Sequence, residues 1–183
     1  PSDGIFGWYK YIQDFPGEFA QLWLKQIASG ASLVWEPFSG SGTTLVAAKL
    51  LGLRSVGFDT NPFMVDVAKA KLDWSLSPDQ LSSMARQIAE RCRGFLPEEP
   101  VLPIKARWTD YDSMLKHSSV KYPEHDKKLA RWISPNVLMR FQTLLREIKA
   151  ISDVRYNRFL TVAAAHLLIP ASNMAFRPNI CYE

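Results

Sequence analysis

Between residues 16 and about 74 the hydrophobic and polar positions alternate between two spacings. Apolar residues recur every three or four positions in some segments, which predicts amphipathic helices, and form short continuous runs in others, which predicts buried strands. The alternation of the two predicts stacked βα units around a parallel sheet. The expected elements are a helix with Phe19, Leu22, Trp23 and Ile27 that stops at Ser29-Gly30, a strand over Ser32–Trp35 buried on both faces, a helix over Thr43–Leu51, a strand over Ser55–Phe58, and a helix from Asn61-Pro62 to Leu72.

The second half of the chain is predicted to be mainly helical. Ser77-Pro78 starts a helix that runs through Cys92, and four prolines then interrupt the segment 97–133, in which we expect one short strand near Ile104–Trp108. Two helices, one from Ser134-Pro135 and one over Tyr156–Ile169, are expected to form a helical hairpin. We therefore expect three regions, which are an N-terminal lid over 1–15, an α/β region over 16–115, and a mainly helical extension over 116–183.

Composition narrows the class of protein. The chain has 183 residues, of which 47% are hydrophobic, enough to bury a core. No run approaches the roughly 18 apolar residues of a membrane span. The net charge of +4 permits a nucleic-acid partner without demanding one, since no basic run exceeds Lys127-Lys128. Cys92 and Cys181 lack metal-ligand spacing, so we expect no metal site and a reducing, cytoplasmic location.

The strongest chemical signal is a glycine loop between the first predicted strand and the next helix. It runs from Glu36 to Thr44 and contains Gly40 and Gly42. Glycines at a strand's carboxyl end let the backbone turn tightly and let a ligand lie against the main chain. The second predicted strand ends at Asp59, where a carboxylate can accept hydrogen bonds from both hydroxyls of a ribose. The pattern predicts a ligand that contains adenosine.

Other interpretations of this loop fit less well. A phosphate-binding nucleotidase loop needs a Lys before its Ser or Thr, and here Gly42 is followed by Thr43. The dinucleotide fingerprint needs a Gly or Ala three positions after Gly42, where this chain has Leu45. A turn that uses glycine for backbone reasons alone stays open, although Asp59 argues against it.

These residues resemble the S-adenosylmethionine-dependent DNA amino-methyltransferases, which methylate adenine N6 or cytosine N4. The stretch Val34–Leu45 is similar to the family's loop Asp-Pro-Phe-x-Gly-Ser-Gly-Thr-Thr, with Glu36 in place of Asp, and Gly57–Pro62 resembles its second-strand acid followed by Asn-Pro. Tyr11–Phe19 looks like the family's Phe-Pro segment. The resemblance is specific over about residues 8–72. It implies an α/β, Rossmann-like methyltransferase fold with a partial parallel sheet, and a place in DNA methylation and restriction-modification.

The resemblance also implies roles for individual residues. The backbone from Phe38 to Gly42 would wrap the methionine end of S-adenosylmethionine, Glu36 would face its ammonium group, and Asp59 would hold the ribose. Phe63 would lie near the adenine, or else would pack in the core. The cofactor-binding residues expected in this way are Phe15, Pro16, Glu36, Pro37, Phe38, Ser39, Gly40, Ser41, Gly42, Thr43, Thr44, Asp59, Thr60, Asn61 and Phe63.

One part of the family's machinery is missing from the sequence. The reaction needs a Ser, Asp or Asn followed by Pro-Pro and an aromatic residue, and no Pro-Pro occurs in this chain. Asp110 is a weak candidate for a contact to the adenine, and the catalytic residues stay unassigned. We expect the isolated chain to be inactive and to reach DNA through a complete enzyme, whose catalytic motif lies in a further C-terminal region or a second polypeptide. A non-catalytic nucleotide-binding or scaffolding module and an NAD-binding domain are the alternatives.

Overall fold

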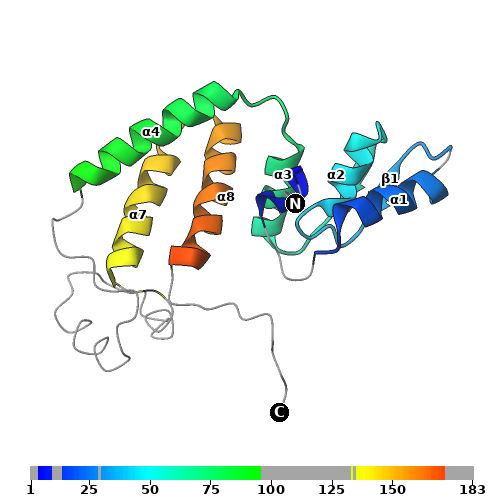
Figure 1. The fold of residues 1–183 in the computed structure, drawn as a ribbon, viewed down its shortest axis with the longest axis horizontal. Helices are drawn as coiled ribbons and strands as arrows, with labels where there is room; N and C mark the ends of the chain where they lie inside the picture. Colours follow the sequence, from blue (N-terminus) through cyan, green and yellow to red (C-terminus); the bar gives the residue numbers. More distant parts are fainter. Residues whose placement is uncertain (1–3, 10–13, 29, 96–132, 134, 172–183) are drawn as a thin grey trace, which may run out of the picture. The chain divides into compact units, whose positions relative to one another are not determined.

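The computed structural model describes residues 4–9, 14–28, 30–95, 133 and 135–171. Contacts divide the chain into two compact units (Figure 1). The first comprises Pro1–Ala85 together with Ile151–Ala163, and the second comprises Arg86–Ala150 together with Ala164–Glu183. The boundaries expected at residues 15 and 115 remain predictions, because residue 115 lies outside the described part of the chain.

The first unit is a mixed α/β structure, as the spacing of apolar residues predicts. Its strands β1 (Val34–Glu36) and β2 (Ser55–Gly57) pair in parallel, with Trp35 opposite Val56. Parallel pairing requires a crossover between the strands, and α2 supplies it. The helical elements of this unit up to residue 72 are a 3-10 helix, η1 (Gly4–Trp8), and the helices α1 (Gly17–Ile27), α2 (Thr43–Leu50) and α3 (Pro62–Leu72).

Local sequence explains where two of these helices begin. Gly42 precedes α2 with φ of 86°, a left-handed conformation that glycine adopts without strain. Asn61 caps α3, because its side-chain Oδ1 accepts a 3.0 Å hydrogen bond from the backbone N–H of Phe63, and Pro62 occupies the first helical position. The glycine loop and the Asn-Pro pair therefore set the starts of the helices that follow β1 and β2.

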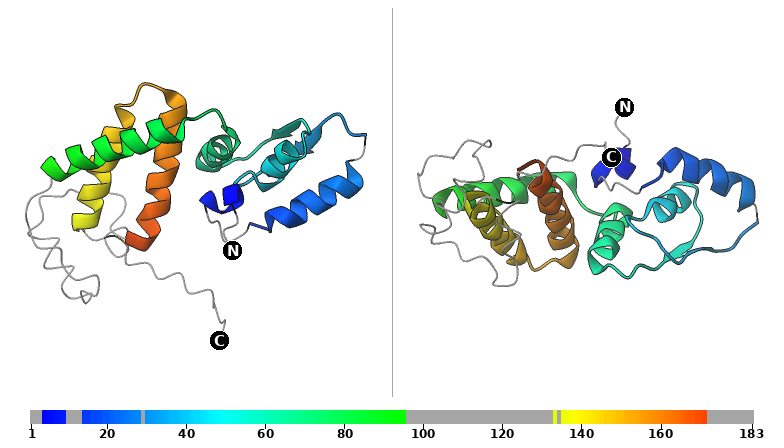
Figure 2. Two further views of the ribbon diagram at one scale, coloured as in Figure 1. Left: turned by 45° about the horizontal axis from the view of Figure 1, so that its top comes forward. Right: turned by 90° about the horizontal axis from the view of Figure 1, so that it is seen from below.

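Small side chains let α1 and α2 lie close together (Figure 2). The cluster at this contact consists of the buried residues Ala20, Leu24, Ala28, Ala47 and Ala48. A second cluster in the same unit joins α3 to the start of α8 (Val154–Ala171) through Val67, Ala70 and Val162. The two clusters fix α2 and α3, the helices that follow the two strands.

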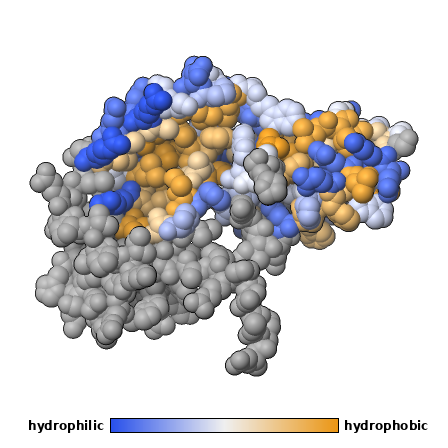
Figure 3. Space-filling model, in the orientation of Figure 1, coloured by the Kyte–Doolittle hydropathy of each residue, from blue (hydrophilic) through white to orange (hydrophobic). Residues whose placement is uncertain are grey.

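One expectation about burial is wrong. The first strand was expected to be buried on both faces, yet Trp35 is 65% exposed, and its neighbours Val56 and Phe58 are 41% and 54% exposed. On α1, the apolar residues Phe19, Leu22, Trp23 and Ile27 are also exposed. Figure 3 shows hydrophobic surface over this region. The physical reason is that the described residues provide a helical layer on one side of the sheet only.

The remaining predicted helices are confirmed. They are α4 (Pro78–Phe95), α7 (Pro135–Lys149) and α8, with the residues 150–153 between the last two. Within the second unit, an ion pair between Arg91 Nε and Glu147 Oε2, 2.8 Å apart, joins α4 to α7. The strand expected near Ile104–Trp108 lies outside the described residues. None of the helices in the described ranges is long and apolar enough to cross a membrane.

Candidate functional site

The loop between β1 and α2 lies at the carboxyl ends of both strands and is hydrogen-bonded to the residue that follows β2. The backbone N–H of Ser39 donates to the carbonyl of Phe58 at 2.8 Å, and the N–H of Gly42 donates to the carbonyl of Ser39 at 2.8 Å. Gly40 has φ of 50° and Gly42 has φ of 86°, so two left-handed residues turn the chain within three positions. In open α/β sheets, ligands bind at this edge.

Asp59 links the end of β2 to the glycine loop. Its Oδ2 accepts a 2.8 Å hydrogen bond from the backbone N–H of Gly40, and its Oδ1 accepts one of 2.8 Å from the N–H of Asn61. A carboxylate oxygen can accept more than one hydrogen bond, so each oxygen keeps capacity for a further donor. The side chain is partly exposed. Asp59 therefore both holds the loop and presents acceptors at its edge.

Glu36, the last residue of β1, turns its carboxylate onto the same loop. Its Oε1 accepts from the backbone N–H of Phe38 at 3.2 Å, and its Oε2 accepts from the Thr44 hydroxyl at 3.0 Å. These bonds place a negative charge beside the first turn of α2, where a helix N-terminus favours it. Through these two bonds, Glu36 connects the start of the loop at Phe38 to the first turn of α2 at Thr44.

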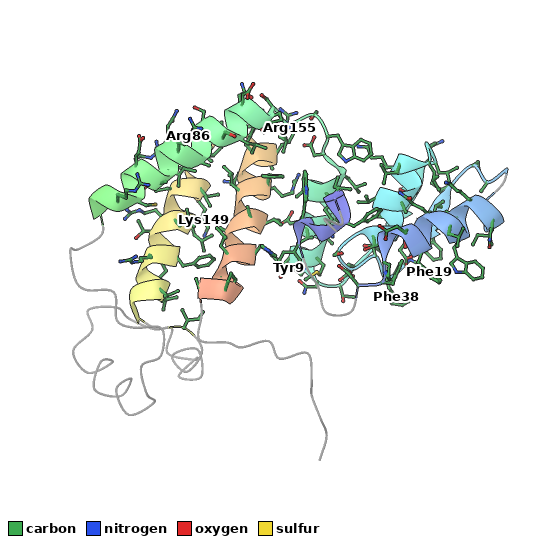
Figure 4. All side chains as sticks on the ribbon, viewed as in Figure 1. Tyr9, Phe19, Phe38, Arg86, Lys149 and Arg155 are labelled. Atoms are coloured by element: carbon green, nitrogen blue, oxygen red, sulfur yellow. The ribbon has the colours of Figure 1, made fainter. Side chains whose placement is uncertain are left out.

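The two glycines of the loop have opposite surroundings. A Cβ atom on Gly42 would lie 2.8 Å from the Cβ of Ala68 on α3, closer than any real contact of this kind, whereas a Cβ on Gly40 would meet nothing within 4 Å. The side chain of Phe38, two residues before Gly40 in the sequence, is 83% exposed (Figure 4). Gly42 is therefore required for packing, and Gly40 leaves main chain open to a ligand.

A buried polar network that the sequence pattern did not predict lies under the loop. The side chains of Lys71 on α3 and Ser41 in the loop are each 1% exposed. Lys71 Nζ donates to Ser41 Oγ at 3.0 Å, and Ser41 Oγ donates to Asp14 Oδ2 at 2.7 Å. Burial lowers the pKa of Lys71, and the Asp14 carboxylate acts in the opposite direction. The available signal was that Lys71 shares a helix face with Val67 and Ala68.

The other expected site residues lie in packing, capping or exposed positions. Phe63 packs against Tyr9, with ring centroids 5.5 Å apart, and joins the cluster around Val67, while Asn61 caps α3. Phe15 is exposed and lies edge-on to Phe19 at 6.2 Å. Thr43 is buried as the first residue of α2, and Pro16, Pro37 and Thr60 are exposed. Asp110 lies outside the described residues, among which no cluster fit for a metal ion is found.

Sequence comparisons agree with the geometry of this region. Residues 4–70 match the model of the N6/N4 DNA methylase family, which confirms the predicted resemblance over that segment. The chain is 34% identical over 68 residues to the type II methyltransferase M.MjaII of Methanocaldococcus jannaschii, and 36% identical over 62 residues to the type II methyltransferase M.BsoBI of Geobacillus stearothermophilus.

The aligned stretches are short relative to this chain and to the two relatives. They cover 37% and 33% of this chain, and only 13% and 12% of the two relatives. No solved structure matches the chain. The match to the family model, over residues 4–70, includes the glycine loop, Asp59 and most of α3.

Proposed function

We propose that residues 4–70, which match the DNA methylase family, form the S-adenosylmethionine-binding part of a DNA methyltransferase acting on an exocyclic amino group of adenine or cytosine. The observation that carries this proposal is the link between Gly40 and Asp59. It joins an open stretch of main chain to a carboxylate with remaining acceptor capacity, at the carboxyl ends of two adjacent parallel strands. The fold that this arrangement favours is Rossmann-like.

The residues present fit the cofactor's three parts. The open backbone at Gly40 suits the methionine portion, for which Glu36 offers a carboxylate toward the ammonium group. Asp59 suits the ribose, since its oxygens can accept from two hydroxyls. The segment Asn61–Phe63 follows directly and is the candidate neighbour of the adenine. Phe15 and Pro16 precede α1 and are the candidates to cover the methionine portion.

The chemistry supplied by the cofactor is a methyl group carried on a sulfonium centre. The proposed role of this chain is to bind and orient the sulfonium centre, because transfer requires the methyl group to lie in line with the accepting nitrogen. The exposed Phe38, two residues before Gly40, offers an apolar surface that a bound cofactor would cover. No residue among those described is assigned to activate the target nitrogen.

A titration tests the ligand assignment. We expect the chain to bind S-adenosylmethionine or S-adenosylhomocysteine at least about tenfold more tightly than NAD or ATP, because the loop lacks both a phosphate-binding Lys and a third glycine. Isothermal calorimetry on the full chain measures the four dissociation constants. NAD binding as tight as S-adenosylhomocysteine binding would support the alternative of a dinucleotide-binding domain.

The complete reaction is proposed to need a further polypeptide segment. The sequence contains no Pro-Pro, and the exposed Trp35, Val56 and Phe58 suit a sheet whose second face is covered by a further layer of structure. The two relatives are also much longer than the stretch they share with this chain. The proposed partner carries a polar residue followed by Pro-Pro and an aromatic residue, and contributes the contacts to a base that is flipped out of the DNA.

A methyl-transfer assay tests this second part. With labelled S-adenosylmethionine and mixed-sequence DNA, we expect no transfer by the chain alone and transfer after mixing with a polypeptide that carries the Pro-Pro-aromatic loop. The matched control is the same mixture with that loop's first residue changed to Ala. Turnover by the chain alone would contradict the proposal.

A further inference from the structure

Three segments far apart in the sequence meet at the Lys71 ammonium group. Lys71 belongs to α3, Ser41 is the residue between the two left-handed glycines of the loop, and Asp14 directly precedes Phe15 and Pro16. Two hydrogen bonds, of 3.0 Å and 2.7 Å, connect the three side chains in series. The network therefore joins the helix, the glycine loop and the segment before α1.

This arrangement is costly unless it does more than fill space. Removing an ammonium group from water is unfavourable, and burial indeed lowers the pKa of Lys71. An apolar side chain of similar length would fill the same position without this cost, as its buried neighbours Val67, Ala68 and Ala70 on α3 do. An apolar residue would not supply a directional hydrogen bond, however, and such a bond fixes the position of its partner.

Ser41 is the residue of the loop that most needs such fixing. The glycines on both sides of it have more conformational freedom than other residues, so the middle of the loop is intrinsically the least restrained part. The Ser41 hydroxyl accepts from Lys71 and donates to Asp14, which leaves it one orientation. Holding this side chain holds the backbone of the loop between Gly40 and Gly42.

We propose that Lys71 is a positioning residue for the glycine loop, which fixes Ser41 and, through it, Asp14, so that the loop and the segment before Pro16 form one preorganised surface. The inference rests on the proposed function in one respect, which is that this surface receives S-adenosylmethionine. Lys71 acts through Ser41 and does not itself contact the reacting atoms. Preorganisation of this kind improves binding because less conformational entropy is lost when the ligand arrives.

Hydrogen exchange of the ligand-free full chain tests the positioning role without any ligand. For Lys71→Met, we expect the backbone amides of residues 39–44 to exchange about tenfold faster than in the original chain, since the hydrogen bond that anchors the loop is lost. Lys69→Met is the matched control, because Lys69 is exposed on the same helix, and its amides should exchange at the original rate. Unchanged exchange in Lys71→Met would overturn the proposal.

A double-mutant cycle with S-adenosylhomocysteine as the probe tests whether Lys71 acts through Ser41. We expect Lys71→Met and Ser41→Ala each to weaken binding by roughly tenfold, and the double variant to bind no more weakly than the weaker of the two. Losses that multiply would show that the two residues act independently and would overturn the proposal. A general loss of packing does not produce this coupling.

A folding failure and a failure of the proposed function can both be distinguished from a failure of the positioning role. If Lys71→Met does not fold, Asp14→Ala takes its place, because it removes the acceptor of the Ser41 hydroxyl at the partly exposed end of the same network, and the same results are expected. If the original chain binds no S-adenosylhomocysteine, the proposed function fails, while the exchange experiment still decides whether Lys71 positions the loop.

Discussion

Gly42→Ala is expected to destabilise the first unit and to abolish ligand binding. The new methyl group would lie 2.8 Å from Ala68 Cβ and 3.0 Å from Ala68 Cα, so the loop and α3 would have to move apart. The left-handed φ of 86° adds strain for any residue with a Cβ. Together these effects amount to about 2 to 5 kcal/mol in the free energy of unfolding. Urea unfolding followed by circular dichroism measures the change.

Substitutions at two other glycines with positive φ distinguish the cost of backbone strain from the cost of a steric clash. A Cβ on Gly40 or on Gly52 would meet nothing within 4 Å, so Gly40→Ala and Gly52→Ala should cost only the strain, about 1 to 2 kcal/mol. We expect Gly40→Ala to lose binding of S-adenosylhomocysteine at that small cost in stability, and Gly52→Ala to keep it. If all three variants unfold at the same urea concentration, the close approach of the loop to α3 is wrong.

Asp59→Ala is expected to weaken both the loop and its affinity for S-adenosylhomocysteine. The substitution removes the acceptor of two 2.8 Å bonds from backbone N–H groups, which should lower the free energy of unfolding by about 1.5 to 3 kcal/mol. Loss of hydrogen bonds to the ribose should raise the dissociation constant by roughly tenfold to a hundredfold more. Thermal unfolding and calorimetric titration measure the two effects separately.

Asp66→Ala is the matched control for this prediction. Asp66 lies on α3 with an exposed carboxylate, and its ion pair with Arg158 spans 3.0 Å. Exposed pairs contribute less than about 1 kcal/mol, so stability and binding should stay nearly unchanged. An Asp59→Ala chain that binds S-adenosylhomocysteine normally would show that the ribose lies elsewhere.

The starts of α2 and α3 could be predicted from the sequence because they depend on neighbouring residues. Gly42 before α2 and Asn61-Pro62 before α3 act within one helical turn, and both boundaries agree with the prediction. The first strand was predicted over Ser32–Trp35 and is observed over Val34–Glu36. Its limits depend on pairing with β2, as in the bond from the Phe58 N–H to the Glu36 carbonyl, and such long-range pairing leaves no local signal.

The candidate site likewise contains residues that the local sequence predicts and one residue, Lys71, that it does not. Gly40 and Asp59 belong to a recognisable motif, and the structure joins them by a direct hydrogen bond. Lys71 was not predicted, because its partner Ser41 lies 30 positions away and Asp14 a further 27. A lysine near the end of a helix is usually exposed, and only the packing of three segments buries this one.

The glycine contacts set the smallest portion of this protein that can be transplanted into another scaffold. The loop from Glu36 to Thr44 is short, but Gly42 needs an alanine at position 68, and Gly57 leaves the space that Leu45 and Ser39 fill, at 2.6 and 2.9 Å from where its Cβ would be. A graft of the loop alone would meet larger side chains at both places and lose its shape. The portable module therefore extends from Asp14, which binds Ser41, through α3, and a designer would carry positions 57 and 68 along with the motif.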